Sequence, residues 1–215
     1  NGKVINNEPQ QSDDSNNIEL YTRRTKSLQI EGNRLKNIEG GYDSTLTIFN
    51  NEVVVTRDGH GISFGESVGI NVLNNNIRSD FNRTYNLIHF YTVNYDTIAN
   101  NTLNGNGKYG GIWHYNENYS GLLIGYDVVI SGNIIENTRD HAIMTHKTLA
   151  KIFNNKIRSF QNGLAIKNQN TTDKIYNNYV QCDGSLPAIG ISVRSRFDEQ
   201  DIAHNVEIYH NNVWI

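Results

Sequence analysis

A short pattern recurs along almost the whole chain: apolar residues flank a pair made of asparagine or glycine followed by asparagine. The second member of the pair falls at Asn33, Asn51, Asn75, Asn101, Asn133, Asn155, Asn178 and Asn212. Successive members are 18, 24, 26, 32, 22, 23 and 34 residues apart. A unit that recurs at intervals of about 20–50 residues is the signature of a solenoid or another repeat array. The chain is therefore expected to form one domain of stacked units.

A second pattern precedes each of these corners and has the alternation of a β-strand. A small residue is followed by an apolar residue, an outward residue and an apolar or aromatic residue, at 61–64, 87–90, 111–114, 142–145, 163–166 and 190–193. Two strand patterns in each repeat are too few for a propeller blade, and no apolar spacing typical of a helix persists. The remaining architecture is a parallel β-helix of about seven or eight rungs, a rung being one full turn of the coil.

The recurring asparagine has a physical reason in such a coil. Asparagine tolerates the left-handed backbone conformation, which a sharp bend between strands requires, better than other non-glycine residues do. Its side-chain amide both donates and accepts hydrogen bonds, so asparagines stacked about 4.8 Å apart can bond to one another. The pattern therefore predicts an asparagine ladder at one corner, with a structural role favoured over ligand contacts.

This corner pattern resembles that of the right-handed parallel β-helix superfamily, which contains pectate-lyase-like proteins and phage tailspikes. The resemblance extends over residues 18–215 and implies an all-β, right-handed parallel β-helix domain. It selects no activity, since the superfamily includes lyases, hydrolases, epimerases and non-catalytic adhesins. Residues 1–17 are polar and lack periodicity, so we expect a polar leader or an irregular cap there. The chain starts without an initiating methionine or a secretory signal pattern, which is typical of a mature or excised part of a larger protein.

Composition narrows the choice of partners. The net charge is −3, which gives no support for nucleic acid as a partner, and no apolar run reaches the roughly 18 residues of a membrane span. His60 and His141 recur at equivalent positions just before the strand pattern. Because no third ligand recurs with them, no metal site and no cofactor are predicted, and bonding of these rings to the backbone is the favoured interpretation.

Alignment of the rungs on the strand pattern predicts two columns of side chains on the outer face of one sheet. The first column is Ser63, His89, Trp113, Met144, Ala165 and Ser192, and the second is Gly65, Tyr91, Tyr115, His146, Lys167 and Arg194. Neighbours in a column lie about 4.8 Å apart, close to the rise of a sugar unit. Aromatic rings can stack on the C–H faces of sugars, and lysine or arginine can neutralise carboxylate or phosphate groups.

The longest repeats support this face. They carry their extra residues directly after the strand pattern, at 116–127 and 194–201. Loops inserted at equivalent points of a solenoid project from one side, which is often the binding side. A polysaccharide is therefore the predicted partner.

Elimination from a uronic acid is one way to cleave such a chain. It needs a base for the proton next to the carboxylate and a cation on that carboxylate. His146 or Tyr115 is the predicted base. The predicted cation is Lys167, Arg194 or Arg196.

Hydrolysis is the other way, and it needs two carboxylic acids on either side of the scissile bond. Glu66 and Glu117 follow the strand pattern in rungs two apart. Their backbones are expected to lie roughly 9–10 Å apart, at the edge of the separation for an inverting pair. Further candidate carboxylates are Asp140, Asp198 and Glu199.

The sequence thus predicts a protein that binds an extracellular or cell-surface polysaccharide and cleaves it. A lyase is favoured over a glycoside hydrolase because the second column ends in cations. The predicted substrate contacts are His89, Tyr91, Trp113, Arg196 and Asp140. The alternative is a non-catalytic β-helical segment of a phage tailspike or appendage, used for adhesion to host glycan or as a rigid shaft. The expected location is extracellular or on a virion surface, and a homotrimer would account for exposed tyrosine and isoleucine residues.

Overall fold

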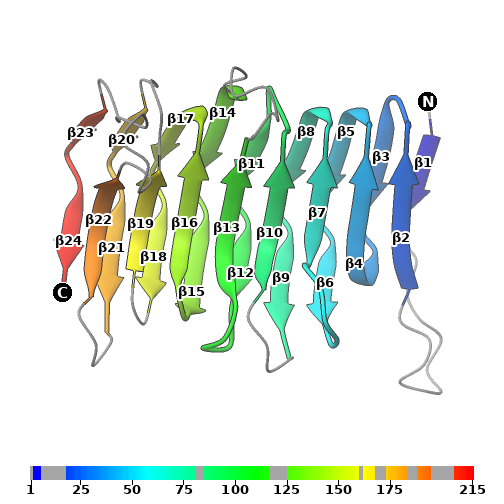
Figure 1. Cartoon of the computed structure of the whole chain (residues 1–215). Coiled ribbons are helices and arrows are strands. Elements are labelled where there is room, and N and C mark those ends of the chain that lie inside the picture. Colours follow the sequence, from blue (N-terminus) through cyan, green and yellow to red (C-terminus); the bar gives the residue numbers. More distant parts are fainter. Residues whose placement is uncertain are drawn as a thin grey trace.

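The chain winds into a right-handed parallel β-helix whose two termini lie at opposite ends (Figure 1). The computed structural model describes residues 2–5, 18–80, 85–116, 125–159, 162–167, 173–183, 188–194 and 206–215. Every named element in these ranges is a β-strand, and neighbouring strands pair in parallel. The fold class predicted from the repeat is confirmed.

Each rung contributes strands to three faces. Face A is a nine-stranded sheet of β1 (Gly2–Ile5), β3 (Leu28–Glu31), β5 (Ser44–Phe49), β8 (Val68–Leu73), β11 (Thr97–Ala99), β14 (Gly125–Ser131), β17 (Thr148–Phe153), β20 (Lys174–Tyr176) and β23 (Glu207–Tyr209). Face B consists of β6 (Glu52–Val55), β9 (Asn76–Ser79), β12 (Thr102–Asn104), β15 (Ile134–Thr138), β18 (Lys156–Ser159), β21 (Tyr179–Cys182) and β24 (Asn212–Trp214). Face C consists of β2 (Ile18–Arg23), β7 (Ile62–Gly65), β10 (Asn86–Tyr91), β13 (Gly110–Tyr115), β16 (His141–His146), β19 (Asn162–Lys167) and β22 (Ile189–Arg194). The strand β4 (Arg34–Gly41) joins faces B and C, because its start pairs with β6 and its end with β7.

The core is a stack of apolar columns that run along the coil. On face A one inward column consists of Ile30, Ile48, Val72, Ile98, Ile130, Ile152 and Ile175, all 0% exposed. Faces B and C contribute matching columns, which include Ile77 and Leu103 on face B and Ile62 and Ile88 on face C. Branched side chains of this kind fit a pleated strand that is buried on one side. Each rung therefore needs only a thin core, which explains why a hydrophobic content of 37% suffices.

The corner between faces A and B holds the asparagine ladder. The side-chain oxygen of Asn101 accepts hydrogen bonds from the backbone N–H and the Nδ2–H of Asn75, at 2.9 and 3.0 Å. The same pair of bonds links successive members at Asn33, Asn51, Asn75, Asn101, Asn133, Asn155, Asn178 and Asn211. The ladder is confirmed except at its last member, because Asn178 bonds to Asn211 and Asn212 instead begins β24.

The left-handed backbone conformation belongs to the residue before each ladder asparagine. These residues are Gly32, Asn50, Asn74, Asn100, Gly132, Asn154, Asn177 and His210, with φ between 53° and 66°. The sequence analysis assigned both the left-handed bend and the ladder hydrogen bonds to one asparagine. In the structure the first residue of each pair makes the bend and the second makes the ladder hydrogen bonds. At the last corner His210 takes the bend position, so the ladder residue is Asn211, one residue before the predicted Asn212.

The coil begins before the predicted boundary at residue 18. The strand β1 pairs with β3, and the Val4 carbonyl accepts a hydrogen bond from Nδ2 of Asn33 at 3.0 Å. Residues 2–5 therefore belong to the first rung, while residues 6–17 lie outside the described part of the chain.

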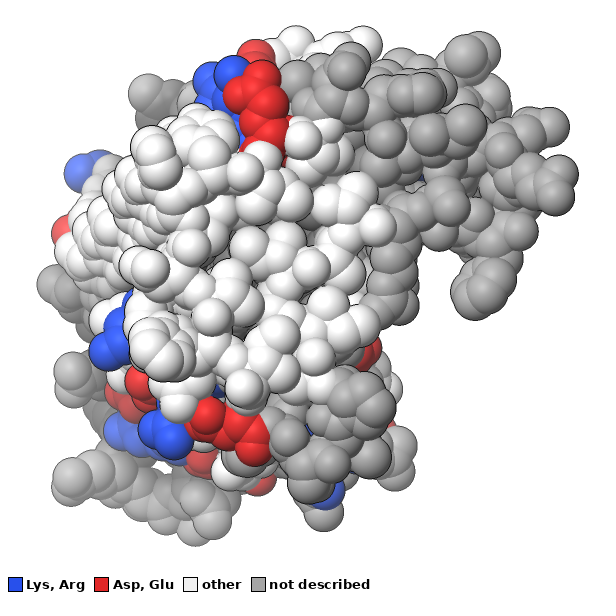
Figure 2. Space-filling view, turned by 90° about the vertical axis from the view of Figure 1, so that its left-hand side faces the viewer, with Lys and Arg blue, Asp and Glu red and all other residues white. Residues whose placement is uncertain are grey.

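The opposite end is mostly uncharged. Figure 2 views this end, formed by β22, β23 and β24, with charged side chains near its upper and lower margins. Ile208, Val213 and Trp214 are 47%, 41% and 64% exposed there. The inward columns of faces A and B thus end in exposed apolar residues.

Candidate functional site

Face C carries the two predicted columns of outward side chains. The parallel register aligns Ser63, His89, Trp113, Met144, Ala165 and Ser192 in one column and Gly65, Tyr91, Tyr115, His146, Lys167 and Arg194 in the other. The predicted alignment of both columns is confirmed. The side chains of Ala165, Lys167 and Arg194 lie outside the described part of the structure, so these three are placed by backbone register alone.

Aromatic rings from three rungs meet along the first column. The rings of His60 and His89 stack with their centroids 4.2 Å apart and an interplanar angle of 21°. The Trp113 ring follows, with its centroid 5.2 Å from that of His89. The indole Nε1–H of Trp113 is buried and has no hydrogen-bond partner among the described residues. This part of the face therefore holds a run of rings and, on Trp113, a buried donor that no described residue pairs.

The second column extends the same surface. The Tyr91 and Tyr115 rings stack at 5.7 Å, and the Tyr115 ring lies 4.7 Å from that of His146. Trp113 and Tyr115 contact edge to face at 6.0 Å, which joins the two columns. We call His60, His89, Tyr91, Trp113, Tyr115 and His146 the aromatic face.

His60 is a member that the sequence analysis assigned only to the backbone. Its Nδ1 does accept a hydrogen bond from the backbone N–H of Asn86 at 3.2 Å, which confirms that interpretation. The stack on His89 comes in addition, because His60 precedes β7 and the column position of His89 lies in the next rung. His141, the equivalent residue three rungs on, instead has Nδ1 2.8 Å from Oδ1 of Asp140.

Burial keeps the two stacked imidazoles neutral. It lowers the pKa of His89 to about 4, helped by the nearby His60 and His114. Burial also lowers the pKa of His60, against the opposing effect of its backbone hydrogen bond. At neutral pH both rings are therefore uncharged and offer flat, weakly polar surfaces.

A polar pair lies inside the coil, directly behind the aromatic face. The Nε2 of His114 lies 2.9 Å from Oδ2 of Asp96, and both side chains are 0% exposed. Oδ1 of Asp96 also accepts the backbone N–H of Ile70 at 3.2 Å. Burial raises the pKa of Asp96, while the hydrogen bond from His114 opposes that shift. Because His114 lies between Trp113 and Tyr115 on β13, the pair anchors the strand that carries both rings.

The sequence analysis missed this pair, although a signal was present. His114 follows Phe64 and Phe90 in an inward column, and its ring meets that of Phe90 at 5.8 Å. A polar residue at a position that is aromatic in the two preceding rungs is a sign of a buried partner, since an unpaired buried polar group is costly.

The register does not align Glu66 with Glu117, the two carboxylates that the sequence placed at equivalent positions. Glu66 is exposed, in the bend after β7, with φ of 47°. The equivalent residue two rungs on is Asn116. Its backbone N–H donates to the His146 carbonyl, just as the backbone N–H of Glu66 donates to the Tyr91 carbonyl. Glu117 is therefore one residue past the aligned position, and its own placement lies outside the described residues.

Four other predicted residues lie outside the described part of the chain or away from the aromatic face. Arg196 lies outside the described residues, as do Asp198 and Glu199. Asp140 precedes β16 and is 54% exposed at its side chain. His146 ends the same strand, so the two are separated by about 16–20 Å of extended chain and share no site.

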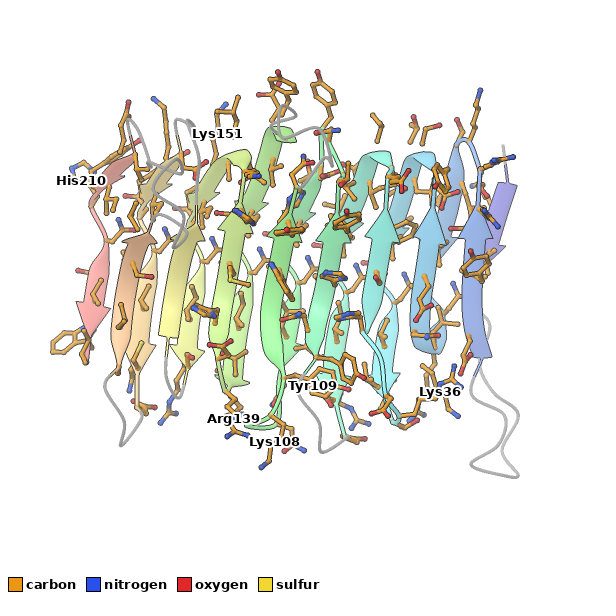
Figure 3. The ribbon with its side chains drawn as sticks, in the orientation of Figure 1. Lys36, Lys108, Tyr109, Arg139, Lys151 and His210 are labelled. Atoms are coloured by element: carbon orange, nitrogen blue, oxygen red, sulfur yellow. The ribbon has the colours of Figure 1, made fainter. Side chains whose placement is uncertain are left out.

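Basic residues near face C gather at its lower edge. Figure 3 shows Lys108 and Arg139 there, beside Tyr109. The Arg139 N–H donates to the Tyr109 carbonyl at 3.2 Å, which places the two cations in neighbouring rungs. The buried Tyr109 ring anchors this edge, with its hydroxyl 3.2 Å from the Gly59 carbonyl oxygen.

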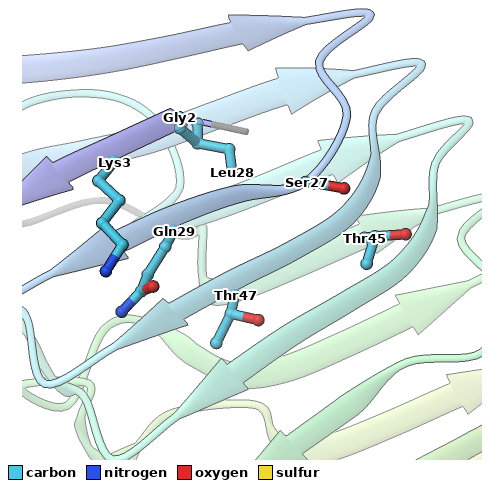
Figure 4. A pocket seen from close by; sticks show the side chains of 7 residues that line it. All are labelled: Gly2, Lys3, Ser27, Leu28, Gln29, Thr45 and Thr47. Atoms are coloured by element: carbon cyan, nitrogen blue, oxygen red, sulfur yellow. The ribbon is translucent and has the colours of Figure 1, made fainter.

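Face A has an open hollow of a different kind. It lies between β1, β3 and β5 and is lined by residues that include Lys3, Gln29 and Thr47 (Figure 4). Its described lining contains neither an aromatic ring nor a carboxylate. The aromatic face of face C is therefore the better site for a ligand.

Within the described ranges, no helix has the length and apolar character needed to cross a membrane. The same ranges contain no group of three or more His, Cys, Asp and Glu side chains placed to hold a metal ion. Comparison with family models, with curated proteins and with solved structures found no match to this chain.

Proposed function

We propose that the protein binds a polysaccharide on the aromatic face. The observation that carries the proposal is the run of His60, His89 and Trp113, whose rings meet across three rungs on the outside of a parallel sheet. A parallel sheet repeats every 4.8 Å or so, which suits a polymer whose units rise by a similar distance.

The chemistry of the rings supports a sugar as ligand. Neutral imidazoles and an indole offer flat apolar surfaces for the C–H faces of a sugar ring, without the desolvation cost of a charge. The Nε1–H of Trp113 is buried, so the proposed contact with a sugar is made by the indole ring face.

Cleavage by elimination is the second function we propose, and the contact between Tyr115 and His146 favours it. Their rings lie 4.7 Å apart, and Lys167 and Arg194 follow them in the same register. A base next to cations suits proton abstraction beside a carboxylate. Hydrolysis by Glu66 and Glu117 is the runner-up, and a lyase is favoured because the second column ends in the cationic residues Lys167 and Arg194.

A non-catalytic module would use the same face. A tailspike-like or appendage segment would adhere to host glycan there, at an extracellular or virion surface, and could assemble as a homotrimer. The two proposals differ in turnover and share the binding site.

The test is binding to a panel of neutral and acidic polysaccharides. Trp113→Ala should weaken binding at least tenfold, since loss of a stacked aromatic anchor commonly costs 2 kcal/mol or more. Tyr179→Ala is the matched control, because Tyr179 is a 37% exposed aromatic residue on face B. Equal binding by both variants, or binding to none of the polysaccharides, would contradict the proposal.

Turnover is measured on the polysaccharides that bind. Growth of ultraviolet absorbance from unsaturated uronate products would identify a lyase, and reducing ends alone would identify a hydrolase. His146→Ala and Tyr115→Phe should each abolish the absorbance change while ligand binding remains. Binding without either product would identify an adhesin.

A further inference from the structure

His60 is the one member of the aromatic face that lies outside a strand. It belongs to the connection 56–60, which joins the end of β6 on face B to the start of β7 on face C. Strand pairing therefore does not fix its side chain in the way that it fixes His89. Gly59, directly before it, has φ of 133°, a backbone conformation that residues with a side chain rarely adopt. The position of His60 has to be set by contacts of the connection itself.

Tyr109 supplies such a contact from 50 residues further along the chain. Its ring is 0% exposed, and its hydroxyl lies 3.2 Å from the Gly59 carbonyl oxygen and 3.4 Å from that of Arg57. A hydroxyl carries one proton, so the two carbonyl oxygens share it. The Ser79 hydroxyl also forms a hydrogen bond with this phenol. The connection that carries His60 is thus tied to the residue that directly precedes β13.

A line of rings runs from Tyr109 to the aromatic face. The Tyr85 ring lies between, with its centroid 6.1 Å from that of Tyr109 and 5.4 Å from that of His60, which it meets edge to face. His60 then stacks on His89 at 4.2 Å. The backbone N–H of Asn86 donates to Nδ1 of His60 at 3.2 Å, which orients the imidazole. The ring of His60 and the backbone before it are therefore both held where the imidazole stacks on His89.

We propose that Tyr109 is a positioning residue of the aromatic face, an inference that rests on the proposed glycan binding. Its hydroxyl holds the connection 56–60 so that His60 stacks on His89. Because Tyr109 is buried, it does not contact the ligand and acts through His60. A single hydroxyl at the lower edge of face C, where Figure 3 shows Tyr109, thus controls glycan affinity on the outer surface.

The pKa of His89, followed by nuclear magnetic resonance, reports the stack without any ligand. Burial and the neighbouring His60 lower this pKa to about 4, so the wild-type His89 stays neutral between pH 7 and pH 5. His60→Ala removes the stacked ring and gives the pKa of an unstacked His89. Tyr109→Phe keeps the buried ring but loses the hydroxyl, and it should move the pKa of His89 from about 4 toward the value in His60→Ala. An unchanged pKa in Tyr109→Phe would overturn the proposed role.

The matched control is Tyr176→Phe. Tyr176 is a tyrosine of β20 on face A whose ring stacks between those of Phe153 and Tyr209, away from the connection 56–60. This variant should leave the pKa of His89 at its wild-type value. A rise equal to that in Tyr109→Phe would show that loss of any tyrosine hydroxyl loosens the coil, and it would overturn the specific role of Tyr109.

Glycan binding is then compared in a double-mutant cycle. His60→Ala should weaken binding of a polysaccharide that the wild type binds by about three- to tenfold, since it removes one aromatic contact. Tyr109→Phe should weaken binding by the wild type but have no further effect in the His60→Ala background. An equal effect in both backgrounds would overturn the action through His60. Binding of no polysaccharide by the wild type would instead overturn the proposed function, and the pKa of His89 would still decide whether Tyr109 holds the stack.

Discussion

The buried pair of Asp96 and His114 makes the sharpest test of how this coil is held together. Both side chains are 0% exposed, and each replaces an apolar residue of the preceding rung. Asp96 is in register with Ile70 and Val128 on face A, and His114 follows Phe90 on face C. We therefore compare the variants Asp96→Val and His114→Leu, alone and together.

Each single change leaves a buried polar group without its partner. His114→Leu leaves the Asp96 carboxyl group with the Ile70 N–H as its one remaining hydrogen-bond donor among the described residues, and removal of one partner of a buried pair costs about 3–5 kcal/mol. Asp96→Val leaves the His114 imidazole unpaired, because its Nδ1 already has no partner among the described residues. The expected loss there is about 1–3 kcal/mol.

The double variant should behave differently from the sum of the single ones. Replacing a buried charged pair by apolar residues of similar volume is often neutral, or stabilising by about 1–4 kcal/mol. The singles and the double together predict a coupling free energy of about 3 kcal/mol or more. Urea unfolding, followed by circular dichroism, gives all four free energies. A double variant as unstable as the two single losses combined would refute the reasoning.

The pH dependence of the same proteins supplies a second measurement. Because burial raises the pKa of Asp96 above its ordinary value of 3.8, the unfolded chain releases this proton first as pH rises. The contribution of Asp96 is therefore fully present below pH 3.8 and falls as pH rises through the raised pKa. The free energy of unfolding of the wild type, measured relative to the double variant, should therefore fall over that window. A rise of this relative free energy with pH would contradict the direction of the shift.

Four further predictions concern single positions. Asn101→Ala should lower the free energy of unfolding in urea by about 3 kcal/mol or more, because the change removes the acceptor of two ladder hydrogen bonds. The adjacent Asn100→Gly should change the same free energy by less than about 1 kcal/mol. Thr45→Gly should raise the free energy of unfolding by roughly 0.5–1 kcal/mol, since Thr45 is exposed and β-branched at φ of 57°. A lower free energy of unfolding would show that the bend is unstrained. Thr145→Val should be neutral or stabilising by up to about 2 kcal/mol, because its buried hydroxyl has no partner among the described residues, and a marked loss in the same assay would reveal one. Because burial lowers the pKa of His89 from 6.5 to about 4, glycan binding followed by fluorescence should be constant down to pH 5 and fall near pH 4, and a midpoint near 6.5 would exclude a neutral His89 as the binding form.

The ladder and the columns could be predicted because both depend on short-range rules. A strand alternates with a period of two, and parallel pairing carries that alternation from rung to rung, so His89 and Trp113 align without knowledge of any contact. The predicted alignment was wrong by one residue where two neighbouring residues fitted the local pattern equally well. At the last corner two adjacent asparagines fit the pattern, and only the pairing of β24 with β21 assigns the ladder to Asn211. Glu117 was misaligned by one residue although the alignment of Gly65 with Tyr115 in the second column already placed Asn116 opposite Glu66.

Contacts across the coil could not be predicted from the repeat. Asp96 and His114 are 18 residues apart and lie on different faces, so their distance depends on how rungs fold around the interior. The stack of His60 on His89 likewise depends on the bend before β7, which turns a residue outside the strand pattern toward the outer face. The covered state of Met144 and His146 is a property of the assembled surface, and residue alternation alone assigns both to solvent.

The strand β13 connects these separate observations. Trp113 and Tyr115 point outward and His114 points inward, as a strand requires of three consecutive residues. Any movement of β13 toward or away from the coil axis would change both the Asp96 contact and the positions of the two rings. A hydrogen bond at 2.9 Å defines that position more narrowly than apolar packing alone, since it weakens steeply with distance and angle. The cost of burying a carboxyl group and an imidazole is therefore understandable in a rung whose outward rings belong to the proposed glycan-binding face.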